Sequence, residues 1–221
     1  MDAARPPLRE RKKLRTREAL IDTALDLFTR QGFTRTTLDE LCYAVEVSKR
    51  TFFRNFVNKE DVAMAPTQDL WAAFLDELRV RDPDGRPLME MLQETLLSAL
   101  ERMTADGWAS RVVLSRNLAA ATPSMNAHGL DFCDRTTRAA LAIVHDRFDI
   151  ADPDDVRPRL ALDILVAAFN KALEKWASRS GAPSRADLGA DLRDTFAAIP
   201  GSLTLTVGPR SPEPPARPAS I

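Results

Sequence analysis

Residues 36–62 constrain the fold more than any other stretch, because they carry three helix-start signals in close succession. Thr37 and Glu40 have the spacing of a capping box, in which a hydroxyl and a carboxylate bond the free amides of a helix start. Ser48 and Asn58 are favourable N-cap residues for two further helices. The stretch therefore predicts two short helices separated by a turn and followed by the start of a third, which is a helix-turn-helix.

The second short helix, which begins after Ser48, places aromatic and basic side chains on opposite faces. Phe52 and Phe56 are one helical turn apart and are expected to point inward. At about 100 degrees per residue, Arg50 and Arg54 then face outward. A helix of this width fits the major groove of DNA, where arginine bonds guanine. On its own, the pattern is more often an ordinary solvated face.

The surrounding pattern resembles the DNA-binding domain of the TetR family of bacterial transcriptional regulators. The resemblance covers roughly residues 9–62 and includes the run ALDLFTRQGF at 24–33. It implies an all-α dimer with an N-terminal helix-turn-helix domain and a C-terminal helical domain for ligand binding and dimerisation. The residues at the family's spacing are Thr37, Leu41, Val47, Ser48, Thr51, Phe56, Lys59 and Glu60.

Three positions depart from the family pattern. Glu46 stands where the family usually has glycine, so the turn must form with a Cβ present, and Val45 replaces the usual alanine. Phe53 replaces a tyrosine whose hydroxyl meets a phosphate in many members. That contact is lost here, which leaves Arg54 as a candidate for part of its role.

The resemblance implies that the predicted DNA-binding residues have two kinds of role. Arg50 and Arg54 are expected to read base edges, whereas polar and basic residues around them hold phosphates. The predicted set is Thr37, Ser48, Lys49, Arg50, Thr51, Arg54, Asn55 and Lys59.

A basic segment precedes the helix-turn-helix. The chain as a whole has a net charge of −1, which argues against a generic polyanion binder. Residues 5–17, however, are basic at Arg5, Arg9, Arg11, Lys12, Lys13, Arg15 and Arg17 and acidic only at Glu10. We interpret this segment as an arm that contacts DNA phosphates; the alternative is a disordered solubilising arm.

The rest of the sequence predicts helices without alternating strand patterns. A helix from about residue 59 is expected to kink or break at Pro66, which lacks an amide donor. From Pro200 onward the chain holds six of its fifteen prolines, which is typical of disorder. The expected later helices are 87–104, 108–121, 124–149, 153–179 and 185–198. We therefore divide the chain into three parts: a basic arm and helix-turn-helix domain (1–62), an all-helical ligand-binding and dimerisation domain (63–199) and a tail (200–221).

Dimerisation and ligand binding are expected in the second domain. The resemblance implies a homodimer through helices 153–179 and 185–198, whereas an intramolecular core would explain their apolar stripe equally well. RTFFR at 50–54 resembles a subgroup that includes regulators associated with mycofactocin and acyl-CoA ligands, which implies an apolar or acyl-CoA-like effector. The candidate ligand-binding residues, which could instead be plain core, are Trp71, Phe74, Met103, Trp108, Asn117, Phe132 and Asn170.

The sequence favours a cytoplasmic, ligand-responsive repressor that binds a palindromic operator as a dimer. It contains no secretory signal, no long apolar run, no Gly-rich phosphate loop and no metal-ligand constellation. We therefore expect no cofactor, no membrane contact and no enzyme activity. A nucleoid-type or scaffolding protein that binds DNA without sequence preference is the alternative.

Overall fold

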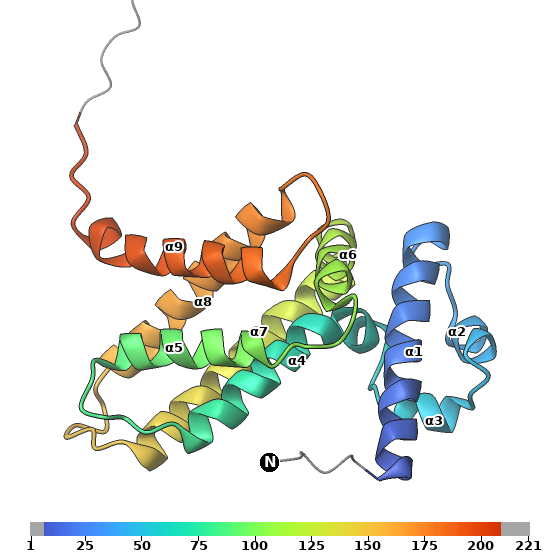
Figure 1. Cartoon of the computed structure of the whole chain (residues 1–221), viewed down its shortest axis with the longest axis horizontal. Helices are drawn as coiled ribbons and strands as arrows, with labels where there is room; N and C mark the ends of the chain where they lie inside the picture. The colour runs from blue at the N-terminus through green and yellow to red at the C-terminus, as the bar shows by residue number, and fades with distance from the viewer. Residues whose placement is uncertain (1–6, 209–221) are drawn as a thin grey trace, which may run out of the picture.

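The computed structural model describes residues 7–208, and every regular element in that range is an α-helix (Figure 1). The predicted all-α fold class is confirmed. Figure 1 shows α1, α2 and α3 gathered at one end of the molecule. The helices are α1 (Leu8–Gln31), α2 (Leu38–Ala44), α3 (Lys49–Phe53), α4 (Lys59–Val80), α5 (Leu88–Glu101), α6 (Trp108–Ala121), α7 (Pro123–Arg147), α8 (Arg157–Ala177) and α9 (Arg185–Leu203).

The three helix-start signals act as the sequence predicts. Thr37 and Glu40 form both hydrogen bonds of a capping box at the start of α2. The side chains of Ser48 and Asn58 each accept from the amide three residues later, at 3.1 and 2.7 Å. Each cap satisfies an amide that has no partner inside its helix, so α2, α3 and α4 begin where local chemistry dictates.

The turn between α2 and α3 forms around Glu46, whose φ of 54° lies in the left-handed region. A residue with a Cβ adopts this conformation at a cost on the order of 1 kcal/mol. The amide of Val47 donates to the carbonyl of Cys42 at 2.9 Å and so closes the turn. The expectation that this turn forms without glycine is confirmed.

The N-terminal cluster, which we define by its buried side chains, lies between α1, α2, α3 and the start of α4. The rings of Phe28 and Phe33 are 4.8 Å apart, and those of Phe52 and Phe56 are 5.8 Å apart. Phe52 and Phe56 therefore point inward as expected. The cluster comprises Leu20, Ile21, Ala24, Leu25, Leu27, Phe28, Phe33, Leu41, Cys42, Phe52, Phe56, Val62, Ala63, Ala65 and Met125.

Helix α4 does not break at Pro66. It continues from Lys59 to Val80 with Pro66 buried inside it. The carbonyl of Pro66 accepts a hydrogen bond from the indole of Trp108 at 2.9 Å. Packing on both sides therefore outweighs the roughly 3 kcal/mol that proline costs a helix interior, and one rigid element joins the two ends of the molecule.

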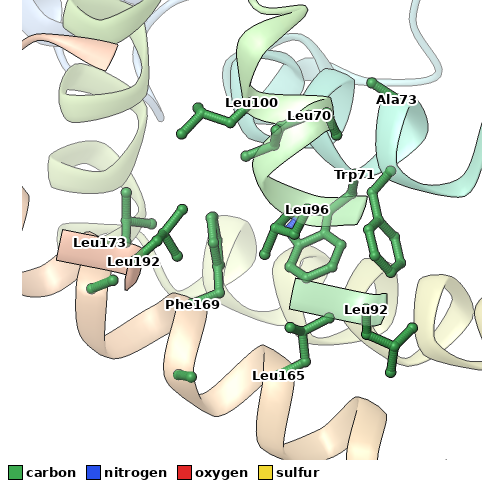
Figure 2. Close-up of a cluster of buried hydrophobic side chains, with 14 of the residues drawn as sticks. Leu70, Trp71, Ala73, Leu92, Leu96, Leu100, Leu165, Phe169, Leu173 and Leu192 are labelled. Atoms are coloured by element: carbon green, nitrogen blue, oxygen red, sulfur yellow. The ribbon is translucent and has the colours of Figure 1, made fainter. Parts of the chain in front are cut away.

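The C-terminal cluster fills the space between α4, α5, α6, α7, α8 and α9, and Figure 2 shows part of it. Trp71 contacts Phe74 and Phe169 edge to face, with ring centroids 5.3 and 5.1 Å apart. Such contacts contribute beyond simple burial. Around these rings, Figure 2 shows leucine side chains from several helices pointing toward one another, among them Leu92, Leu96, Leu165 and Leu192.

The two clusters are joined at the corner between α6 and α7. Met125, from the start of α7, is fully buried in the N-terminal cluster, and Leu118 of α6 packs against the same cluster. Arg111 of α6 also forms a two-pronged ion pair with Asp22 of α1, at 2.6 and 3.1 Å. Ala65 belongs to the N-terminal cluster and Leu70 to the C-terminal cluster. We therefore propose that the boundary between the two parts of the chain lies within α4, between these two residues, and not at residue 62.

The predicted end of the last helix is wrong. Helix α9 passes Pro200 and ends at Leu203, beyond the expected residue 198. The residues that follow are not packed against the protein, since Leu205 and Val207 are 75% and 84% exposed. Residues 209–221, which hold the remainder of the expected tail, lie outside the described range, as do residues 1–6.

Two further properties hold for the part of the chain that the structure describes. No helix there is long and apolar enough to cross a membrane. No three metal-ligating side chains of the types His, Cys, Asp or Glu gather there into a potential metal site.

Candidate nucleic-acid interface

The outward face of α3 carries two guanidinium groups. Arg50 and Arg54 are exposed, whereas Phe52 on the opposite face is fully buried. No ion pair or side-chain hydrogen bond joins either arginine to another residue of the described chain. Both guanidinium groups are thus available to a partner, as the sequence predicts.

Lys49 is exposed but already paired. Its ammonium lies 2.8 Å from a carboxylate oxygen of Asp39 on α2. An exposed pair of this kind contributes little to stability, so a DNA phosphate can compete with Asp39 for the lysine.

The predicted polar contacts on α2 and α3 serve first as parts of the helix caps. The hydroxyl of Thr37 belongs to the capping box, and the hydroxyls of Ser48 and Thr51 lie 3.0 Å apart. Asn55 donates from its side-chain amide to the carbonyl of Thr51 at 2.7 Å. Thr37 and Ser48 remain exposed. Their oxygens therefore lie at the surface while they fix the helix starts.

The capping box also affects ionisation. Hydrogen bonds from the backbone amide and then the hydroxyl of Thr37 hold the pKa of Glu40 below its ordinary value. In the same helix, burial raises the pKa of the Cys42 thiol, so Cys42 stays protonated as a core residue.

Lys59 is bonded to the protein itself in the free structure. Its ammonium donates to the carbonyls of Phe33 and Thr36, both at 2.8 Å, and lies 4.6 Å from the centre of the Phe33 ring. These contacts tie the start of α4 to the loop after α1. In the free protein Lys59 thus has a structural role, which the sequence could not reveal because the partners are backbone carbonyls, and its contact with phosphate stays a prediction.

The basic segment is helical rather than an irregular arm from Leu8 onward, since it forms the first turns of α1. Arg17 pairs with Asp69 of α4 through two hydrogen bonds of 2.7 and 2.8 Å, and its guanidinium lies over the ring of Phe56. Arg17 therefore joins α1 to α4 and is not free for phosphate. The remaining described basic residues that are exposed are Arg9, Lys12, Lys13 and Arg15, whereas Arg11 is half-buried and Arg5 lies outside the described range.

The sequence interpretation did not include Tyr43, which is 87% exposed at the end of α2. Phe53, on α3, is 54% exposed. Helix geometry does offer a signal for Tyr43, because it lies about 200 degrees around the helix from buried Leu41.

The predicted ligand-binding residues do not line one common cavity. Trp71, Phe74 and Trp108 are buried core residues, and Met103 and Phe132 pack against the same cluster. Asn117 of α6 and Asn170 of α8 lie at exposed positions, so neither amide is buried in this chain, and their role in ligand binding stays a prediction. An amide in an apolar helix sequence indicated burial, but the helix has an outward face that sequence periodicity did not separate.

Two hollows lie near the loop between α8 and α9. The larger, of about 360 Å³, is bounded by the loop before α6, including Met103 and Trp108, and by Arg185. The smaller, of about 160 Å³, lies beside Trp176 and Arg179. Neither hollow reaches Trp71 or Phe74.

Comparisons with known proteins agree with this arrangement. The model of the family described as bacterial regulatory proteins, tetR family, matches residues 20–65. The HTH-type transcriptional regulator TcmR of Streptomyces glaucescens is 34% identical over 181 residues, which cover 79% of each chain. The chain belongs to the TetR family. Its TetR-type helix-turn-helix is α2 and α3, and it is a DNA-binding transcriptional regulator.

Two more distant relatives are consistent with this assignment. The biofilm operon negative transcriptional regulator IcaR of Staphylococcus epidermidis is 28% identical over 80 residues, which cover 36% of this chain and 43% of IcaR. The crystal structure of a transcriptional regulator from Aquifex aeolicus VF5 is 16% identical and covers 83% of this chain and 99% of its own, with a TM-score of 0.51. The similarity to the Aquifex aeolicus structure concerns the fold alone.

Proposed function

We propose that this protein is a ligand-responsive repressor that binds a palindromic operator as a homodimer. The observation that carries the proposal is the exposed, unpaired face of α3, where Arg50 and Arg54 project from a helix fixed by caps at its start and by buried Phe52 beneath it. A rigid helix that presents two guanidinium groups suits direct reading of guanine in the major groove. Operator binding also implies action in the cytoplasm, where the bacterial chromosome lies.

Repression is supported by a relative. IcaR is a negative transcriptional regulator, and its similarity to this chain falls within 80 aligned residues. A protein that occupies an operator blocks transcription by position alone, without needing contacts to polymerase. The proposal therefore requires only that the protein binds its operator and is released from it.

The dimer is proposed to form through α8 and α9, which pack against each other. The outward face of α9 is rich in small residues, with Ala186, Ala190 and Ala197 exposed at helical spacing, and Leu160 of α8 is 53% exposed. Small side chains allow a second pair of helices to approach closely. A two-fold axis between the pairs would place two α3 helices for half-sites about 34 Å apart.

Molar mass measured by light scattering tests the dimer directly. We expect a mass near twice that of the 24.5 kDa chain. Ala190→Arg with Ala197→Arg should shift the mass toward the monomer, whereas Ala142→Arg, on the exposed surface of α7, should not. A monomeric wild-type protein, both free and on DNA, would contradict the proposal.

Selection of bound duplexes from a random DNA pool tests operator binding. We expect an inverted repeat whose two halves are protected together in a footprint. Equal affinity for selected and random duplexes, with a steep salt dependence, would instead favour a nucleoid-type binder without sequence preference.

The effector is proposed to be a small molecule that acts on the C-terminal cluster. The chain has three tryptophans, Trp71, Trp108 and Trp176, and all three are buried in that cluster. Compounds can therefore be screened, fatty acyl-CoA esters among them, for a change in tryptophan emission together with release of the selected duplex. An emission change without release would identify a ligand but not an effector.

A further inference from the structure

Two aromatic side chains are exposed on the helix-turn-helix, and no others are exposed anywhere in the chain. The sequence has ten Phe, three Trp and one Tyr, all within the described residues. Only Tyr43 of α2 and Phe53 of α3 are exposed, at 87% and 54%. Single exposed apolar residues need no explanation, but this pair lies on the two helices that carry the DNA-reading face.

The Asp39–Lys49 ion pair brings a positive charge to the face of α2 that carries Tyr43. Asp39 precedes Tyr43 by four residues on α2, so both lie on one face of that helix. Long side chains of a helix lean toward its N-terminus, which directs the Tyr43 ring over the turn that holds Asp39. The ammonium of Lys49 lies 2.8 Å from Asp39, so it reaches the face of α2 that also carries Tyr43.

The surface around this pair continues onto α3. Phe53 follows Lys49 by one helical turn, and Arg50 and Arg54 are the next residues along α3. The phenol of Tyr43 has no hydrogen-bond partner within the described chain. The helix-turn-helix surface thus carries a hydroxyl donor and an ammonium group together with an apolar ring and the two guanidinium groups.

We propose that Tyr43 and Lys49 form a binding site for one phosphate of the DNA backbone, at the edge of the half-site that α3 reads. This inference rests on the proposed operator binding. The Tyr43 hydroxyl donates to a phosphate oxygen, and the Lys49 ammonium exchanges Asp39 for the same phosphate. Asp39 holds Lys49 in place in the free protein but repels the approaching phosphate. A neutral donor in this position contributes affinity without reading sequence.

The test compares Tyr43→Phe with the wild-type protein on two duplexes of equal length, one recovered by selection and one scrambled. We expect Tyr43→Phe to weaken binding to both duplexes alike, by about 3- to 10-fold, which is modest for a hydrogen bond to a charged group. The salt dependence should not change, because the hydroxyl is neutral. Val57→Ala, at another exposed position of this domain (76%), is the matched control and should bind as the wild type does.

A second variant addresses the lysine. Asp39→Asn removes the competing carboxylate, so affinity for both duplexes should rise and log affinity should fall more steeply with log salt, by up to about one unit of slope. Unchanged affinity and slope in Asp39→Asn would overturn the role given to Lys49.

The single tyrosine permits a direct observation. Protein labelled with 3-fluorotyrosine gives one fluorine resonance, from position 43. We expect this resonance to move when either duplex is added. A resonance that stays in place at saturation, or that moves only with the selected duplex, would overturn the phosphate assignment, as would wild-type affinity in Tyr43→Phe.

These outcomes separate the inference from the proposed function. If selection yields an operator whose recognition needs Arg50 but Tyr43→Phe binds it normally, the phosphate site is wrong and the repressor proposal stands. If selection yields no preferred sequence at all, the repressor proposal fails, whatever the tyrosine does.

Discussion

The helix-turn-helix and the C-terminal helices are specified in different ways. Helices α2, α3 and α4 each begin with a side-chain cap, from Thr37, Ser48 and Asn58. Helices α5, α6, α7 and α8 begin without one. Among the C-terminal helices only α9 begins with such a cap, from Ser184. The starts of the first region are thus defined by bonds between residues three apart, whereas α5, α6, α7 and α8 depend on packing between residues far apart in the chain. Local chemistry fixes the DNA-reading surface, whereas long-range packing fixes the scaffold behind it.

The largest expected effect tests whether the two regions are energetically separate. Phe52→Ala removes a fully buried ring from the N-terminal cluster, and Phe169→Ala removes a ring of 2% exposure from the C-terminal cluster. Each should lower the free energy of unfolding by about 3–5 kcal/mol. Because Met125 and the whole of α4 join the two clusters, we expect each variant to unfold in one transition.

The measurement is thermal unfolding followed at once by circular dichroism and tryptophan emission. All three tryptophans report on the C-terminal cluster, whereas circular dichroism reports on every helix. If Phe52→Ala lowers the circular dichroism midpoint and leaves the emission midpoint unchanged, the regions unfold independently, and the joint at α6 and α7 is weaker than its packing indicates.

The next effect should appear in DNA binding and not in stability. Arg50→Ala and Arg54→Ala each remove a guanidinium group that is exposed and forms no ion pair or side-chain hydrogen bond within the described chain. We expect each to reduce discrimination between selected and scrambled duplexes by about 1–3 kcal/mol while leaving the melting temperature unchanged.

Competition binding with both duplexes measures this discrimination. Arg138→Ala, which removes an exposed guanidinium from α7, is the matched control and should not affect it. If the Arg50 and Arg54 variants discriminate between the two duplexes as well as the wild type does, other residues read the bases. The outward face of α3, although fixed by its caps, would then not recognise sequence.

The contrast between the regions also explains what the sequence could predict. The cap of α3, the inward Phe52 and the outward Arg50 follow from spacing alone, because a short capped helix has one geometry. The structural contacts of Lys59 could not be predicted, because its partners, the carbonyls of Phe33 and Thr36, come together only when α1 and α4 pack. The exposure of Asn170 could not be predicted for the same kind of reason, since only the packing of α8 decides which of its faces is exposed.

A smaller effect distinguishes capped from uncapped helix starts. Asn58→Ala removes the side-chain bond to the Asp61 amide and should lower the free energy of unfolding by about 1 kcal/mol. Thr122 occupies the corresponding position before α7 but makes no cap bond there, so Thr122→Ala should cost much less. Chemical denaturation of both variants measures the difference. Equal losses would mean that side-chain caps do not distinguish the two regions.

The smallest effect concerns pH and compares a cap with a surface ion pair. Glu40 and Glu174 both have pKa values below their ordinary value of 4.5, the first through hydrogen bonds from Thr37 and the second through Lys171. A lowered folded-state pKa means that each carboxylate stabilises the fold above its ordinary pKa, and that this contribution disappears as the pH falls through the lowered value. Glu40→Gln and Glu174→Gln should therefore each reduce the loss of stability between neutral and acidic pH.

Salt separates the two carboxylates. The Lys171–Glu174 pair is exposed on both sides, so its effect should shrink as ionic strength rises. The Glu40 effect depends first on a short hydrogen bond of 2.7 Å from the Thr37 amide, which salt screens less. Melting temperatures are recorded from pH 3 to 7 at low and at high salt. At high salt, the difference in pH dependence between Glu40→Gln and the wild type should persist, whereas the difference between Glu174→Gln and the wild type should disappear. If both vanish together in salt, the capping box acts mainly as a charge interaction, and the N-terminal helices are not fixed by directional bonds.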